Sequence, residues 1–161
     1  MRAGAVYLGV IGENSPAPRA LEAAEAVGRC VAEAGAVLVC GGLGGVMEAA
    51  CRGARAAGGI TIGILPGSDR AEGNAYLTHA IPTGLGPARN ILVVRAADAV
   101  IAVGGRFGTL SEIAFAKIEG RPVVGLETWT LSRPEMPDPI IRAGTAGEAV
   151  AKALAALGET R

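Results

Sequence analysis

The chain has 161 residues, carries no net charge at pH 7 and is half apolar, although only 3% of its residues are aromatic. This length suits one domain around one hydrophobic core, which must be built from Ala, Val, Ile and Leu. The sequence shows no basic stripe and no apolar run long enough for a membrane span or a signal-peptide core. We therefore expect a cytoplasmic protein with no nucleic-acid or membrane partner.

The first half of the chain alternates apolar runs, which predict strands buried on both faces, with stretches of helical periodicity. The predicted strands cover residues 6–11, 36–40 and 60–65. The predicted helices cover residues 18–34 and 46–57. Pro66 and Gly67 end the third strand, and residues 68–79 are predicted to form a loop.

The second half continues the alternation. The predicted strands cover residues 80–83, 99–103, 122–126 and, as a short last strand, 140–142. The predicted helices cover residues 88–97, 109–119 and 145–157. Thr145 and Glu148 form a Thr-x-x-Glu capping signature at the start of the last helix.

Strands that alternate with helices of about ten residues or more predict βαβ units and a parallel sheet. Right-handed crossover connections then place helices on both faces of that sheet. No linker or internal repeat divides the chain. We therefore predict a single α/β domain over residues 1–161, with a doubly wound, Rossmann-like and mostly parallel sheet.

Two segments share one design, in which a buried strand leads through a glycine-rich turn into a helix. The first turn contains Gly41, Gly42, Gly44 and Gly45. The second contains Gly105, Arg106, Phe107, Gly108 and Thr109. In a parallel sheet both turns lie at the carboxyl edge of the strands, where open α/β folds bind ligands. Glycine permits close backbone approach, and the helix start offers free N–H groups, so both turns are candidate phosphate sites.

Neither turn matches the GxGxxG or GxxxxGK[ST] motif. In a single turn of this kind, the glycines could serve only to fold the tight connection between strand and helix, without any ligand. It is the repetition of the design that predicts binding of a phosphate-bearing nucleotide.

Thr109 and Glu112 also have two interpretations. The spacing favours a capping box at a helix start, whereas the functional alternative places the Glu112 carboxylate at the mouth of a ligand cleft. Arg89 lies in the first turn of its predicted helix, where a cation opposes the helix dipole and requires a partner such as Glu112 or a phosphate.

The stretch Thr83-Gly84-Leu85-Gly86-Pro87-Ala88-Arg89, the strand over residues 97–103 and Gly104-Gly105-Arg106-Phe107-Gly108-Thr109-Leu110-Ser111-Glu112 together resemble the Lonely Guy (LOG) superfamily. Proteins of this group were long mislabelled as lysine decarboxylases, and their hallmark is PGGxGTxxE with an arginine upstream. The glycines of residues 41–45 resemble the superfamily's other glycine turn. Residues 53–67 and 83–89 are most similar to its short branch of molybdenum cofactor carriers.

This resemblance implies a homodimer or homotetramer and a small phosphorylated, nucleotide-like ligand held at both glycine turns and Gly84. In hydrolytic members the residues that match Arg89 and Glu112 are catalytic. They cleave a nucleoside 5′-monophosphate to a free base and ribose 5-phosphate. No cofactor is expected, and Cys30, Cys40 and Cys51 match no zinc motif and are expected to be reduced thiols, so no metal is expected either.

The sequence departs from the hallmark at Gly104, which replaces a proline, and at Arg106, which replaces the second glycine. Two hypotheses stay open. In the first, the chain is a phosphoribohydrolase in which Arg89 anchors the ligand and Glu112 stabilises positive charge or activates water. An Arg–Glu pair in a cleft favours this hypothesis. Alternatively, it is a non-catalytic carrier or sensor of a phosphorylated ligand such as molybdenum cofactor, to which Arg106 adds positive charge. Lysine decarboxylation is not supported, because neither of the two lysines stands out as a Schiff-base site.

Overall fold

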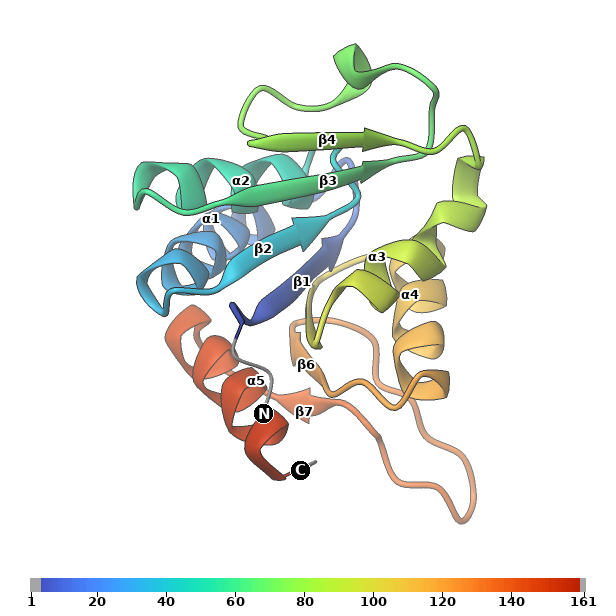
Figure 1. The fold of residues 1–161 in the computed structure, drawn as a ribbon. Coiled ribbons are helices and arrows are strands. Elements are labelled where there is room, and N and C mark those ends of the chain that lie inside the picture. The colour runs from blue at the N-terminus through green and yellow to red at the C-terminus, as the bar shows by residue number, and fades with distance from the viewer. Residues whose placement is uncertain (1–3, 160–161) are drawn as a thin grey trace.

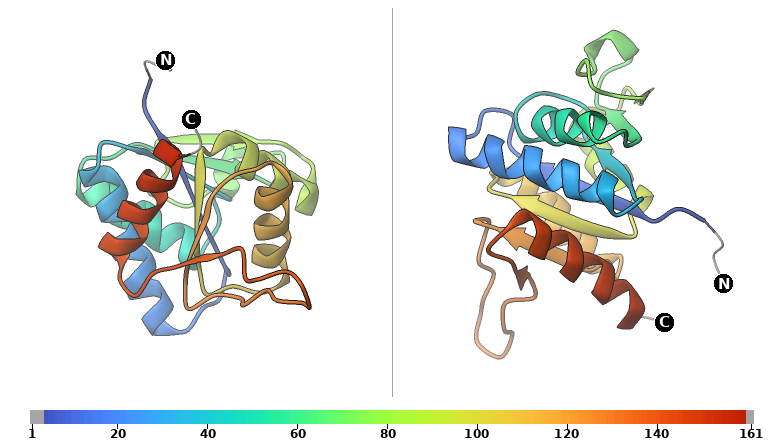
Figure 2. Two further views of the ribbon diagram at one scale, coloured as in Figure 1. Left: turned by 90° about the horizontal axis from the view of Figure 1, so that it is seen from below. Right: turned by 90° about the vertical axis from the view of Figure 1, so that its left-hand side faces the viewer.

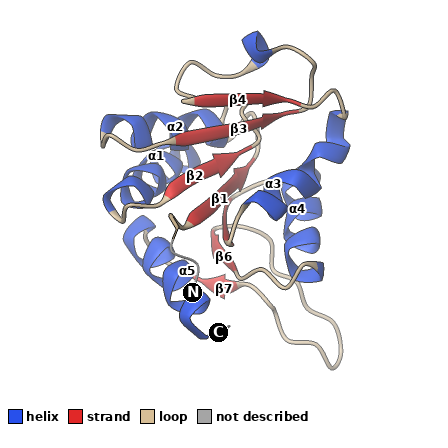
Figure 3. Cartoon of the chain, viewed as in Figure 1, coloured by secondary structure: helices blue, strands red, loops and turns tan. Residues whose placement is uncertain are grey.

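The computed structural model describes residues 4–159 and shows an α/β architecture (Figures 1 and 3). The strands are β1 (Tyr7–Gly12), β2 (Val37–Cys40), β3 (Thr61–Leu65), β4 (His79–Pro82), β5 (Ala99–Val103), β6 (Val123–Leu126) and β7 (Ile141–Arg142). The α-helices are α1 (Pro18–Glu33), α2 (Val46–Ala56), α3 (Asn90–Ala96), α4 (Phe107–Ile118) and α5 (Ala146–Glu159), with short 3₁₀ helices η1 (Arg70–Glu72) and η2 (Gly86–Arg89). Residues 1–3 and 160–161, and with them the two ends of the predicted domain, lie outside the described residues.

The strands form one sheet in the order β4-β3-β2-β1-β5-β6-β7, and each neighbouring pair is parallel. The chain runs outward from β1 through β2 and β3 to β4, and then returns to β5 on the other side of β1. The direction of winding therefore reverses between β1 and β5, as in doubly wound folds. The doubly wound parallel α/β sheet predicted from the sequence is confirmed.

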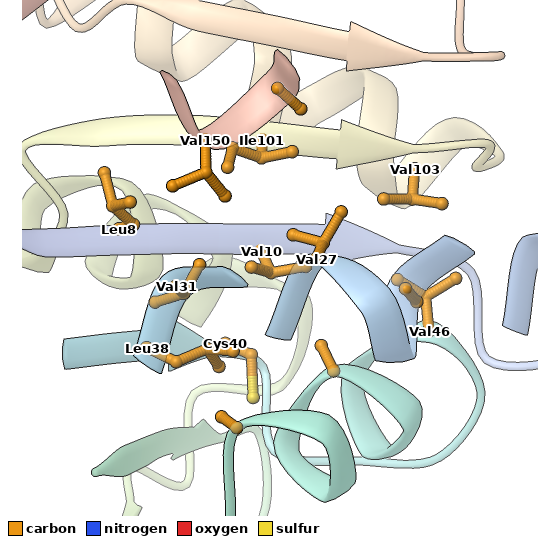
Figure 4. Packing of buried hydrophobic residues seen from close by; sticks show 14 of the residues in the cluster. Leu8, Val10, Val27, Val31, Leu38, Cys40, Val46, Ile101, Val103 and Val150 are labelled. Carbon is orange, nitrogen blue, oxygen red and sulfur yellow. The ribbon is translucent and has the colours of Figure 1, made fainter. Parts of the chain in front are cut away.

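Helices cover both faces of the sheet, with α1, α2 and α5 on one face and α3 and α4 on the other (Figure 2). Because successive side chains of a strand point to opposite faces, Val10 belongs to the first core and Ile11 to the second. Figure 4 shows the first core, where Val10 lies beside Val27 of α1, and Val31 of α1 and Val46 of α2 belong to the same cluster. Within residues 4–159, no helix is both long and apolar enough to cross a bilayer.

Helices α1 and α2 approach each other closely through two glycines. A Cβ on Gly28 would overlap the carbonyl group of Ala50, and a Cβ on Gly53 would overlap the carbonyl group of Glu25. No side chain therefore separates the two helix backbones at their crossing. This close crossing positions α2, whose start carries the first glycine turn.

The structure differs from the sequence prediction mainly between β3 and β5. The helix predicted over residues 88–97 is shorter and follows the 3₁₀ turn η2. The boundaries differ by at most two residues, because the segment before Asn90 winds as a 3₁₀ turn rather than as the first turn of the α-helix. By contrast, the predicted cap of the last helix is confirmed, because Thr145 Oγ1 accepts a hydrogen bond from the Glu148 N–H at 3.2 Å.

Gly53→Ala is expected to destabilise the protein, because the added methyl group must push α1 away from α2. The free energy of unfolding should fall by about 2 kcal/mol in urea denaturation. Gly147→Ala is the matched control, since a Cβ at this exposed position of α5 would meet no atom within 4 Å. The control should be neutral or stabilise by up to about 1 kcal/mol, and equal losses in both variants would contradict the close crossing.

Candidate functional site

The connections that follow β1, β2, β3, β4 and β5 converge on one cleft of about 390 Å³. It lies at the carboxyl edge of the sheet, where the winding reverses between β1 and β5. Open α/β sheets bind their ligands at such a point, because the connections on either side diverge and leave a crevice. Arg89, Arg106, Gly108, Thr109 and Glu112, all proposed from the sequence, line this cleft.

Arg89 is a buried cation at the end of η2, with 7% of its surface exposed. Its guanidinium group lies directly against Gly41, where a Cβ would overlap Nη1. Gly41 therefore makes room for the arginine rather than lining the cleft itself. Within the described residues, Arg89 Nε has no hydrogen-bond partner. A buried guanidinium group with an unused donor is costly, so this cleft is suited to an anion.

Glu112 is equally buried on α4 and faces the same cleft. Burial raises the pKa of Glu112 from its ordinary value of 4.5 to about 8, although the charge of Arg89 partly opposes this shift. Burial likewise lowers the pKa of Arg89, against the opposing effect of Glu112. Near neutral pH, Glu112 is therefore mostly a neutral acid that can donate a hydrogen bond, and Arg89 keeps a positive charge that no neighbouring carboxylate fully neutralises.

The capping interpretation of Thr109 and Glu112 is wrong. Helix α4 begins at Phe107 with Arg106 as its N-cap residue, and no side chain caps it. The helix starts earlier than predicted because Gly104 and Gly105 adopt φ values of 54° and 107° and turn the chain before Arg106. Thr109 and Glu112 therefore both lie inside the helix, where their spacing places them on the same buried face.

The second glycine turn combines tight packing with an open surface. A Cβ on Gly105 would overlap the side chain of Thr109, whereas a Cβ on Gly108 would meet nothing within 4 Å. The backbone at Gly108, in the first turn of α4, is thus accessible from the cleft. Arg106 Nε forms an ion pair with Glu13 Oε2 at 3.0 Å. Phe107 does not line the cleft, and its ring centroid lies 5.8 Å from that of Trp129.

The remaining predicted residues shape the connections without lining the cleft. Gly42 and Gly45 adopt φ values of 76° and 62°, and Gly44 packs beside Asn14. Gly84 lies on the surface near Ser68. The residues outside the lining are Gly41, Gly42, Gly44, Gly45, Gly84, Gly105 and Phe107. Contact between any of these residues and a ligand stays a prediction.

Sequence reasoning missed several residues of the cleft. Glu13 and Asn14 follow β1 and face the cleft; their position after an apolar strand at the carboxyl edge was the available signal. Asn90 also lines the cleft, and its Nδ2 donates to Ser111 Oγ at 3.1 Å. Ser111 in turn donates to the Gly108 carbonyl at 2.6 Å. Asn90 thereby joins α3 to the first turn of α4.

The buried thiols are also close together, with Cys40 Sγ 3.5 Å from Cys51 Sγ, and both cysteines are free. Within residues 4–159, no group of three or more His, Cys, Asp or Glu side chains is placed to hold a metal ion. The expectation that the protein needs no metal or cofactor stays a prediction.

A family model and a sequence relative both match most of this chain. The model of the SLOG cluster4 family matches residues 5–155. An uncharacterised protein of Archaeoglobus fulgidus is 44% identical over 122 residues, which cover 76% of this chain and 80% of that protein.

Two solved structures are similar to this chain in both fold and sequence. A molybdenum cofactor binding protein from the phototrophic bacterium Rippkaea orientalis superposes with a TM-score of 0.88 and 34% identity, covering 96% of this chain and 99% of that one. A molybdenum cofactor carrier protein from Chlamydomonas reinhardtii superposes with a TM-score of 0.84 and 34% identity, covering 98% of this chain and 100% of that one.

The raised pKa of Glu112 should make the stability of the protein depend on pH. Between pH 4.5 and about 8 the folded protein keeps a proton that the unfolded chain has lost. The free energy of unfolding therefore falls as the pH rises through this window. Glu112→Gln removes the titrating group, so the wild type should lose a few kcal/mol relative to the variant over this range. Urea denaturation of both proteins at several pH values measures the difference, and a difference independent of pH would contradict the shift.

Proposed function

The chain belongs to the SLOG cluster4 family, and we propose that it is a carrier or sensor of a phosphorylated, pterin-type ligand such as molybdenum cofactor. SLOG joins the SMF/DprA and LOG proteins, so the LOG resemblance holds at the level of the superfamily. The proposal is supported by the similarity over nearly the whole chain to proteins described as binding or carrying molybdenum cofactor. The observation that carries it is the buried Arg89, whose Nε has no partner in the described residues.

The cleft supplies three features that such a ligand needs. Its volume of about 390 Å³ lies in the usual range for small-molecule sites. The first turn of α4 has no side-chain cap and no acidic residue, so its free N–H groups can hold a phosphate. Arg89 supplies the positive charge, and neutral Glu112 supplies a hydrogen-bond donor for a polar atom of the ligand.

Hydrolysis of a nucleoside 5′-monophosphate is the second candidate function. One observation favours it: Glu112 holds a proton near pH 7 beside a cleft suited to phosphate, as a general acid must. In this alternative the protonated Glu112 would donate a proton to the departing base, instead of stabilising positive charge or activating water as the sequence suggested, and Arg89 would hold the ribose phosphate. The catalytic roles of both residues, the cytoplasmic location and the absence of a nucleic-acid partner stay predictions.

A ligand panel separates the two functions. Molybdopterin compounds and nucleoside monophosphates should be titrated against the wild type and Arg89→Ala, with release of free base followed by chromatography. The carrier proposal predicts tight binding of a pterin compound, no release of base, and a loss of affinity on the order of tenfold or more in Arg89→Ala. Release of base that Glu112→Gln reduces about a hundredfold would instead establish the hydrolase.

Arg95→Ala is the matched control for Arg89→Ala. Arg95 lies on α3 and its guanidinium Nη2 pairs with Glu119 Oε1 at 2.9 Å, outside the cleft. This variant loses the same charge and should bind as the wild type does. If no pterin compound binds to the wild type, the proposed function is wrong.

We also propose that the protein is a homo-oligomer. Phe107 and Ile118 are 79% and 77% exposed on the outer face of α4, and a second copy could bury this surface by two-fold pairing. We expect light scattering at micromolar concentration to give a dimer or tetramer. Ile118→Asp should shift the protein toward monomer without unfolding it, because the side chain faces solvent in the single chain. A wild-type monomer under these conditions would contradict the proposal.

A further inference from the structure

An ion pair joins two walls of the cleft at the point where the winding of the sheet reverses. Glu13 lies on the connection after β1, and Arg106 is the N-cap residue of α4 after β5. Arg106 Nε lies 3.0 Å from Glu13 Oε2, and both residues line the cleft. The pair therefore lies beside the uncapped first turn of α4, where a phosphate would bind.

The two partners are held very differently. The Arg106 side chain is 80% exposed, whereas that of Glu13 is 20% exposed. The backbone of Arg106 is anchored, because Trp129 Nε1 donates to its carbonyl oxygen at 3.3 Å. An ion pair with one partner in solvent is weak, since water and salt compete with it. The guanidinium group of Arg106 can therefore change partners while its backbone stays in place.

A second and independent feature of the cleft points to an anionic ligand. Arg89 is buried, with only 7% of its surface exposed, and its Nε has no partner within the described residues. Burial also keeps Glu112 mostly neutral near pH 7. Glu13 is the other carboxylate of the cleft lining, and it pairs with the exposed Arg106 rather than with the buried Arg89.

We propose that Arg106 binds the phosphate of the ligand, and that Glu13 occupies Arg106 until a doubly charged phosphate displaces it. A phosphate monoester dianion can accept two parallel hydrogen bonds from a guanidinium group and carries more charge than a carboxylate. A phosphate diester, with a single charge, competes less well. Glu13 therefore lowers the affinity of the cleft for any phosphate, and the stronger pairing of Arg106 with a dianion favours ligands that carry a terminal phosphate. This inference rests on the proposed function only in that the cleft binds phosphate.

The test uses methyl phosphate as the probe, with dimethyl phosphate as the singly charged comparison. Dissociation constants are measured by ³¹P NMR at pH 7.5 and constant ionic strength for the wild type, Glu13→Gln, Arg106→Ala and the double variant. Glu13→Gln should bind methyl phosphate roughly two- to fivefold more tightly, because the competing carboxylate is gone. Arg106→Ala should weaken binding on the order of tenfold, and the preference for methyl over dimethyl phosphate should fall.

The double variant decides between direct contact and charge shielding. If Arg106 contacts the phosphate, Arg106→Ala weakens binding even when residue 13 is Gln. If Arg106 merely shields Glu13, the arginine can be removed without loss in that background, and the proposal is wrong. An unchanged or weaker affinity in Glu13→Gln also overturns it, as does a lack of methyl phosphate binding to both the wild type and Glu13→Gln.

The Arg19–Glu127 ion pair provides matched controls. It lies at the same carboxyl edge, both side chains are exposed, and neither residue lines the cleft. Arg19→Ala and Glu127→Gln change the net charge by the same amounts and should leave the affinity for methyl phosphate unchanged. Failure of pterin compounds to bind would refute the proposed function, but the methyl phosphate results would still test the roles of Arg106 and Glu13.

Discussion

Parallel pairing of β1 with both β2 and β5 is the constraint on which the rest of the structure depends. Parallel strands are joined by crossover connections, and the carboxyl ends of all strands lie at the same edge of the sheet. Every connection therefore leaves its strand at that one edge. Because the chain winds away from β1 in both directions, the segments after β1 and β5 diverge there. The cleft is the consequence of that divergence, and it would exist with almost any side chains of suitable size.

The side chains placed in the cleft determine what it can bind. Arg89 loses hydration by burial and is left with an unused Nε donor. An ionised Glu112 would balance the charge of Arg89, but burial raises the pKa of Glu112 and favours its neutral form. The protein thus keeps a positive charge incompletely balanced inside a cleft, at a cost to its own stability. Binding of an anion would recover part of that free energy, which is a physical reason for affinity.

Glycine serves three different purposes around this site. Gly28 and Gly53 allow α1 and α2 to touch and so support the start of α2 from behind. Gly41 gives space to the guanidinium group of Arg89, and Gly105 gives space to Thr109. Gly108 alone of these is open to the cleft. A glycine-rich turn therefore owes most of its composition to packing, even where the turn adjoins a candidate ligand site.

The sequence by itself determined the α/β class, the parallel sheet and the ends of every predicted strand and α-helix to within two residues, because the period of apolar residues depends on local geometry. It also identified Arg89 and Glu112 as candidate partners. It missed the 3₁₀ turns η1 and η2, and it began α4 two residues late, after a turn in which the φ values of Gly104 and Gly105 depend on packing. Only the tertiary structure decided that Glu112 is buried and mostly neutral, that Gly41 lies against Arg89 and that Glu13 faces Arg106. These relations join segments far apart in the chain, and burial and charge are set by all the groups that surround a side chain rather than by its neighbours in sequence.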